Sequence, residues 1–116
     1  MSQDRKIFVV EDEPLIAMML EDFLDALGYE QAGGADSVAT ALEGVERGGF
    51  DAAILDVNLR GGERCWPVAD ALAERGIPFV LATGGGDDMI ADAHRDRPRL
   101  PKPYTMDAVR NAVETL

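Results

Sequence analysis

A chain of 116 residues is long enough to bury one hydrophobic core, and its apolar fraction of 47% is ordinary for a globular protein. It carries 22 acidic against 11 basic residues, and this formal net charge of -11 repels nucleic-acid phosphates and anionic membrane surfaces. We therefore expect a single domain, spanning residues 1–116, with no direct contact with nucleic acid or membrane. No apolar run approaches the roughly 20 residues of a membrane span, and no signal peptide opens the chain, so we expect a cytoplasmic protein.

The first half of the chain alternates between strand-like and helix-like segments. An apolar run at 7–10 reads as a buried strand, and from Pro14 the apolar residues recur at helical spacing. Proline suits the first turn of a helix and glycine the position after its end, so Pro14 and Gly28 mark the limits of this helix. A weak strand near 30–34 and a helix over about 37–47 complete the second unit.

The clearest strand is the third, at 52–55, which is apolar throughout and ends at Asp56. A strand without a polar side is typical of a parallel sheet that is covered on both faces. A short helix over about 68–75 and a fourth strand at 77–82 follow, and the fifth strand is compressed into 99–100. Alternating strands and helices of these lengths predict an α/β fold around a parallel sheet.

The connection after the fourth strand is the least regular part of the chain. Three glycines at 84–86 give a flexible loop, and a polar, weakly periodic segment continues to Arg97, where we expect a weak helix. We expect His94, inside this segment, to be solvated, because no residue with metal-ligand spacing surrounds it. The last helix begins near Thr105 or Asp107.

Polar side chains follow four of the five predicted strands: Glu11, Asp12, Asp56, Thr83 and Lys102. Ligands of open parallel sheets bind beyond these carboxyl ends, and the strand order 2-1-3-4-5 would bring the three carboxylates together. Carboxylates so close would either raise a pKa or recruit a divalent cation, of which Mg²⁺ suits hard oxygen ligands. With a hydroxyl donor and a lysine beside them, the set has the parts needed for phosphoryl transfer.

Four segments, in order along the chain, resemble the motifs of the receiver domain of response regulators in two-component signalling. They are the acidic pair in 9–13, the phosphoacceptor motif in 54–58, the hydroxyl position in 81–84 and the lysine motif in 101–104. The resemblance covers the whole chain. It implies a flavodoxin-like (βα)5 three-layer sandwich with a five-stranded parallel sheet in the order 2-1-3-4-5.

The resemblance also implies roles for the acidic residues. Asp56 would be the phosphorylated residue. The side chains of Glu11, Asp12 and Asp56 and the backbone carbonyl of Asn58 would hold Mg²⁺.

At the other strand ends, Thr83 and Lys102 would hold the phosphoryl oxygens, and the bond between Lys102 and Pro103 is a candidate for the cis geometry. Where the family commonly has an aromatic switch residue, this chain has Arg99, which puts the usual switch in doubt. Residues 78–85 resemble instead an alphaproteobacterial subgroup of single-domain regulators with a Phe-Ala-Thr-Gly signature. The match is incomplete, because leucine replaces its phenylalanine.

The function implied is that of a stand-alone response regulator without an effector domain, a signalling switch with self-catalysed phosphorylation and dephosphorylation. A sensor histidine kinase, a phosphotransfer protein or a small acyl phosphate would supply the phosphoryl group. The product would switch a surface for a downstream protein or relay the phosphate. We expect the glycine loop and the weak helix after it to reorder on phosphorylation.

Two alternatives stay open. The first is a Mg²⁺-dependent aspartyl phosphohydrolase. Such an enzyme would need a cap or pocket for its substrate, and a chain of 116 residues leaves few residues from which to build one. The second is a degenerate receiver, which would bind its partner without phosphorylation. Arg99 is compatible with this alternative, because it stands where the family commonly has its aromatic switch residue.

Overall fold

Five parallel strands form the centre of the computed structural model, which describes residues 5–83, 90–101 and 104–116. Their order is β2-β1-β3-β4-β5, as predicted. The strands are β1 (Lys6–Val10), β2 (Glu30–Ala35), β3 (Ala52–Asp56), β4 (Phe79–Thr83) and β5 (Arg99–Pro101). The α-helices in the described ranges are α1 (Pro14–Ala26), α2 (Val38–Arg47), α3 (Trp66–Glu74) and α4 (Met106–Glu114). None of these helices is long and apolar enough to cross a bilayer.

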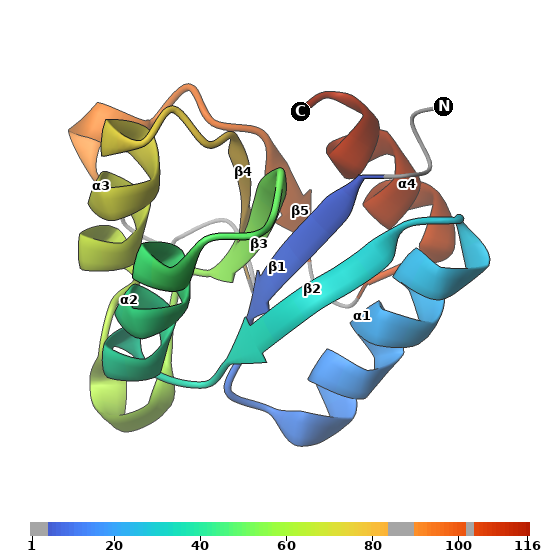
Figure 1. Ribbon diagram of the computed structural model, residues 1–116, viewed down its shortest axis with the longest axis horizontal. Coiled ribbons are helices and arrows are strands. Elements are labelled where there is room, and N and C mark those ends of the chain that lie inside the picture. The colour runs from blue at the N-terminus through green and yellow to red at the C-terminus, as the bar shows by residue number, and fades with distance from the viewer. Residues whose placement is uncertain (1–4, 84–89, 102–103) are drawn as a thin grey trace.

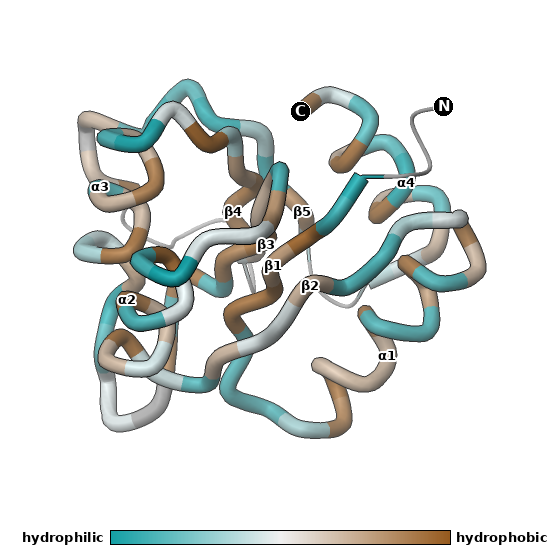
Figure 2. The backbone as a smooth tube through the Cα atoms, in the orientation of Figure 1, coloured by the Kyte–Doolittle hydropathy of each residue, from teal (hydrophilic) through white to brown (hydrophobic). Residues whose placement is uncertain are grey.

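The helices cover the sheet on both faces (Figure 1). Because successive side chains of a strand point to opposite faces, Val9 and Ile54 pack toward α1 and α4, whereas Phe8 and Leu55 pack toward α2 and α3. Every residue of β3 is buried. Figure 2 shows the hydrophobic residues concentrated in the central strands. The three-layer, flavodoxin-like architecture predicted from the sequence is confirmed.

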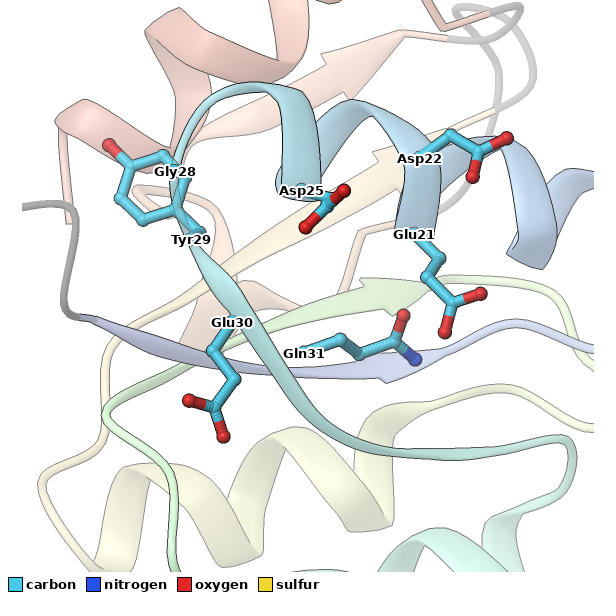
Figure 3. Close-up of a pocket in the computed structure, with 7 residues that line it drawn as sticks. All are labelled: Glu21, Asp22, Asp25, Gly28, Tyr29, Glu30 and Gln31. Carbon is cyan, nitrogen blue, oxygen red and sulfur yellow. The ribbon is translucent and has the colours of Figure 1, made fainter.

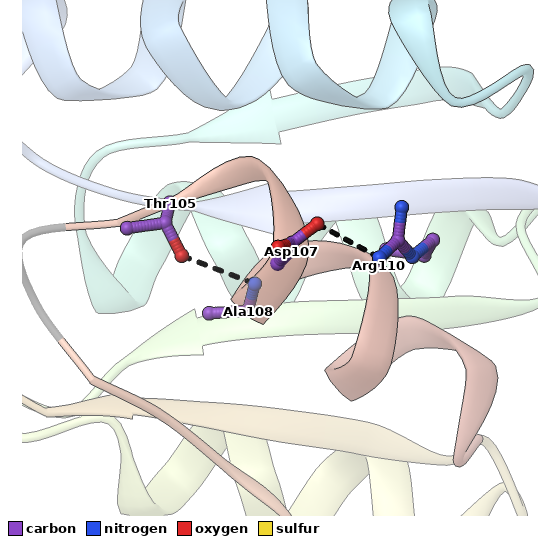
Figure 4. A network of polar contacts seen from close by, with 4 residues as sticks. All are labelled: Thr105, Asp107, Ala108 and Arg110. Carbon is purple, nitrogen blue, oxygen red and sulfur yellow. Dashed lines mark hydrogen bonds and ion pairs between the residues drawn. The ribbon is translucent and has the colours of Figure 1, made fainter.

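Local sequence signals fix the starts of two helices. Before α2, the Ser37 hydroxyl accepts a hydrogen bond from the backbone N–H of Thr40, and the Thr40 side chain reaches back to the backbone N–H of Ser37. This reciprocal pair is a capping box. Before α4, Thr105 Oγ1 accepts a hydrogen bond of 3.1 Å from the backbone N–H of Ala108 (Figure 4). Thr105 is therefore the N-cap, one of the two predicted starts of this helix.

The connection between β4 and β5 differs from the prediction. Where a weak helix was expected up to Arg97, the described residues 90–98 contain only a 3-10 turn, Asp92–His94. The glycine loop at 84–86, which was expected to reorder on phosphorylation together with the segment up to Arg97, lies outside the described residues, and its reordering stays a prediction. The expectation of a solvated His94 was wrong, because its side chain is only 3% exposed. The His94 ring packs against Trp66 of α3 and Phe79 of β4, and its Nε2 lies 2.8 Å from Asp70 Oδ1 of α3.

Candidate functional site

Three carboxylates meet at the carboxyl edge of the sheet. Glu11 and Asp12 directly follow β1, and Asp56 is the last residue of β3. The two strands are parallel neighbours with Val10 opposite Leu55, so the residues that come next emerge side by side. One oxygen from each of the three carboxylates lies within 4.8 Å of the others. The structure thus brings these three predicted residues together.

Hydrogen bonds hold two of these carboxylates in place. Glu11 is 4% exposed, and its Oε1 accepts a hydrogen bond of 3.2 Å from the hydroxyl of Tyr104 while its Oε2 accepts one of 3.2 Å from the backbone N–H of Glu13. Asp56 is also 4% exposed, and its Oδ1 accepts a hydrogen bond of 3.2 Å from the backbone N–H of Asn58. Donors of this kind stabilise the charged form of a buried carboxylate.

The negative charge of the cluster acts on two neighbouring groups. Burial raises the pKa of the Tyr104 hydroxyl far above its ordinary value, and the charges of Glu11 and Asp56 add to the rise. Burial, followed by the charge of Asp56, raises the pKa of the Cys65 thiol to about 12. Both groups therefore stay protonated at neutral pH, and Tyr104 remains a hydrogen-bond donor to the cluster.

The other predicted site residues are placed less completely. Thr83 ends β4, one residue beyond Ala82, which lies opposite Asp56 in the ladder between β3 and β4. Lys102 and its bond to the next residue lie outside the described part of the chain, and their predicted roles stay predictions. So does the ligand role of the Asn58 carbonyl. Arg99 is exposed on β5 and donates a hydrogen bond of 3.1 Å to the backbone carbonyl of Arg95.

The contact between Tyr104 and Glu11 was not predicted from the sequence. It joins residues 93 positions apart, which no periodicity or motif spacing addresses. The only signal available was the residue type, since a tyrosine buried beside an acidic cluster needs a partner for its hydroxyl.

A second acidic region lies at the opposite edge of the sheet. A cleft of about 850 Å³ is formed where the end of α1 meets the start of β2 (Figure 3). Four carboxylate side chains line it, together with Gly28, Tyr29 and Gln31. They are Glu21, Asp22, Asp25 and Glu30. None of the three clustered carboxylates contributes to this cleft, so its size does not make it the candidate site.

Comparison with known proteins identifies the family of this chain and agrees with the fold. Residues 7–114 match the response regulator receiver domain, so the chain belongs to this family of two-component signalling proteins. It is similar to SdrG from Sphingomonas melonis Fr1, with 62% sequence identity over 98% of this chain and 97% of that one. The solution structure of SdrG matches this fold with a TM-score of 0.87. The BeF3-activated conformation of SdrG from Pseudomonas melonis Fr1 is 63% identical with a TM-score of 0.81, over 94% of this chain and 92% of that one.

A curated relative is longer than this chain. The transcriptional regulatory protein PdtaR from Mycobacterium tuberculosis is 28% identical over 113 residues, which are 95% of this chain and 55% of PdtaR. The chain thus spans about half the length of that relative.

Proposed function

We propose that this receiver accepts a phosphoryl group on Asp56, from the phosphohistidine of a histidine kinase or phosphotransfer protein or from a small acyl phosphate, in a Mg²⁺-dependent reaction. The observation that carries the proposal is the approach of Glu11, Asp12 and Asp56 to within 4.8 Å at the ligand-binding edge of the sheet. The similarity to a chain solved in a BeF3-activated conformation supports it, because a beryllofluoride group on a carboxylate has the tetrahedral shape of a phosphoryl group.

The residues at the site fit a divalent cation. Receiver domains bind Mg²⁺ at an acidic pocket, and here the side chains of Glu11, Asp12 and Asp56 with the backbone carbonyl of Asn58 would hold it. These are the hard oxygen donors that Mg²⁺ prefers. When bound, the ion neutralises charge on the carboxylates and on the phosphoryl oxygens that approach them.

The side chains then divide the work of the transfer. A carboxylate oxygen of Asp56 attacks the phosphorus, an oxygen–phosphorus bond forms, and the bond from phosphorus to the donor's leaving group breaks with its electron pair. The hydrogen bond from the Asn58 N–H keeps the Asp56 carboxylate oriented for this attack. Thr83 donates its hydroxyl to one phosphoryl oxygen, and Lys102 neutralises another.

An exposed apolar pair beside the site is the proposed contact for the protein that donates the phosphoryl group. Leu15 is 78% exposed and Met18 is 58% exposed, both near the start of α1. Residues three apart share one face of a helix, so the two side chains form one apolar surface a few residues beyond Asp12. The output is a change in the binding surface of the last two strand–helix units, or transfer of the phosphoryl group to another protein.

Mass spectrometry of the intact protein tests the proposal. After incubation with Mg²⁺ and acetyl phosphate, the wild type gains one phosphoryl group, and EDTA prevents the gain. Asp56→Asn gains none. Asp51→Asn is the matched control, because Asp51 precedes β3 at the opposite edge of the sheet, and it is phosphorylated like the wild type. A folded wild type that binds Mg²⁺ but takes no phosphoryl group, from acetyl phosphate or from a phosphohistidine donor, contradicts the proposal and favours a degenerate receiver.

A further inference from the structure

The hydrogen bond from Tyr104 to Glu11 links two distant parts of the fold. Glu11 directly follows β1, and Tyr104 directly precedes Thr105, the N-cap of α4. Both side chains are buried, with 6% of Tyr104 and 4% of Glu11 exposed. The tyrosine ring belongs to the core cluster under α1 and α4, so only the hydroxyl of Tyr104 takes part in the acidic cluster.

We propose that Tyr104 is a positioning residue for the cation site: its hydroxyl holds the Glu11 carboxylate in the orientation that binds Mg²⁺, and it connects that site to the start of α4. This inference rests on the proposed function, because it assumes that Glu11 helps to hold the ion.

The geometry at Glu11 supports this role. Among the described residues, Tyr104 donates to Oε1 of Glu11 and the Glu13 N–H donates to Oε2, so rotation of the carboxylate is restrained from both sides. The like charges of Asp12 and Asp56 repel the Glu11 carboxylate, and the hydrogen bond from Tyr104 limits how far that carboxylate can turn in response. A ligand that is already held loses less conformational freedom when the ion binds.

The hydrogen bond from the Tyr104 hydroxyl to Glu11 Oε1 is 3.2 Å long and joins two buried side chains. In metal sites generally, partners that hydrogen-bond to a ligand are worth about 10- to 100-fold in metal affinity. Of the two described donors to Glu11, the Glu13 N–H belongs to the same loop, whereas Tyr104 comes from the segment that leads into α4.

The test is a Mg²⁺ titration of the intact chain without any phosphodonor, followed by NMR of the backbone amides. Tyr104→Phe keeps the buried ring and removes only the hydroxyl, and we expect its Mg²⁺ dissociation constant to rise about 10-fold. Tyr29→Phe is the matched control, because Tyr29 is also buried in the same core cluster but lines the cleft at the opposite edge, and its dissociation constant stays that of the wild type.

Two further readings separate positioning from a structural role. The urea midpoint of Tyr104→Phe in EDTA stays close to that of the wild type, and the amide shifts that Mg²⁺ causes at 105–108 in the wild type shrink in the variant. In the Glu11→Gln background, Tyr104→Phe changes Mg²⁺ affinity little, as a double-mutant cycle requires for two residues that act together.

Each contrary outcome has a distinct meaning. Equal Mg²⁺ affinity for the wild type and Tyr104→Phe overturns the inference and leaves the proposed function standing. Failure of the wild type to bind Mg²⁺ overturns the proposed function first. Loss of the folded state of Tyr104→Phe in EDTA also overturns the inference, because it assigns the hydroxyl to stability.

Discussion

The imidazole of His94 is buried against an exposed carboxylate on α3, with 2.8 Å between its Nε2 and Asp70 Oδ1. Its ring stacks on Trp66 with 6.0 Å between centroids and meets Phe79 edge-on at 5.5 Å. His94 lies in the connection between β4 and β5, so these contacts fasten that connection to α3 and to the sheet.

We expect His94→Ala to lower the free energy of unfolding by about 2–3 kcal/mol, because it removes a buried ring and leaves a cavity between two aromatic side chains. We expect Asp70→Ala to lower the free energy of unfolding by less than about 1 kcal/mol, because the Asp70 side chain is 64% exposed and water can take its place beside His94. Urea denaturation at pH 7 measures both values. Equal losses in the two variants would show that the hydrogen bond, and not the ring packing, supplies the stability.

His94 also marks what the sequence could and could not predict. The order of the strands was predictable from the resemblance to receiver domains. Given that order, the approach of Glu11, Asp12 and Asp56 followed, because strand ends in a parallel sheet share one edge and these residues follow clear apolar runs. The contacts of His94 with Asp70 join segments 24 positions apart in a weakly periodic region. Such a contact depends on how the connection packs, and no local pattern carries that information.

The start of α4 offers a comparison between a helix cap and a surface ion pair (Figure 4). Thr105→Ala removes the acceptor for the Ala108 N–H, and we expect a loss of about 1 kcal/mol in the free energy of unfolding. Asp107→Ala breaks the 2.7 Å pair with Arg110, but Asp107 is 77% exposed, so we expect less than about 0.5 kcal/mol. Urea unfolding of the two variants measures this difference. A loss in Asp107→Ala as large as that in Thr105→Ala contradicts the prediction.

The buried thiol of Cys65 makes stability depend on alkaline pH. Its pKa is raised from 9.0 to about 12 in the folded chain, mainly by burial. Between pH 9 and pH 12 the Cys65 thiol therefore ionises in the unfolded chain but stays protonated in the folded chain. The stabilising contribution is therefore complete below pH 9 and is lost as the pH rises toward 12. We expect Cys65→Ala to lose less stability than the wild type between pH 8 and pH 11, measured by urea unfolding at each pH. Parallel curves for the two proteins contradict the prediction.

Repulsion within the acidic cluster should destabilise the folded chain when no cation is bound. Two unit charges 4.8 Å apart repel by about 3 kcal/mol at an effective dielectric constant near 20. Asp56→Asn removes one of the three charges, although it also weakens the hydrogen bond from the Asn58 N–H. In EDTA we therefore expect it to raise the free energy of unfolding by about 1–2 kcal/mol.

Bound Mg²⁺ should make the wild type more stable than Asp56→Asn, the reverse of the order expected in EDTA. An ion that binds only the folded state stabilises it by RT ln(1 + c/Kd), where c is the free Mg²⁺ concentration. The wild type, with all three carboxylates, binds the ion more tightly and therefore gains more stability than Asp56→Asn. The control is Asp96→Asn, which removes an exposed charge away from the cluster and so reports the effect of lowering the net charge of -11 alone. Urea midpoints of the three proteins in EDTA and in saturating Mg²⁺ supply the comparison. If Asp96→Asn gains as much stability in EDTA as Asp56→Asn does, the gain comes from net charge, and the three carboxylates do not repel one another enough to recruit a cation.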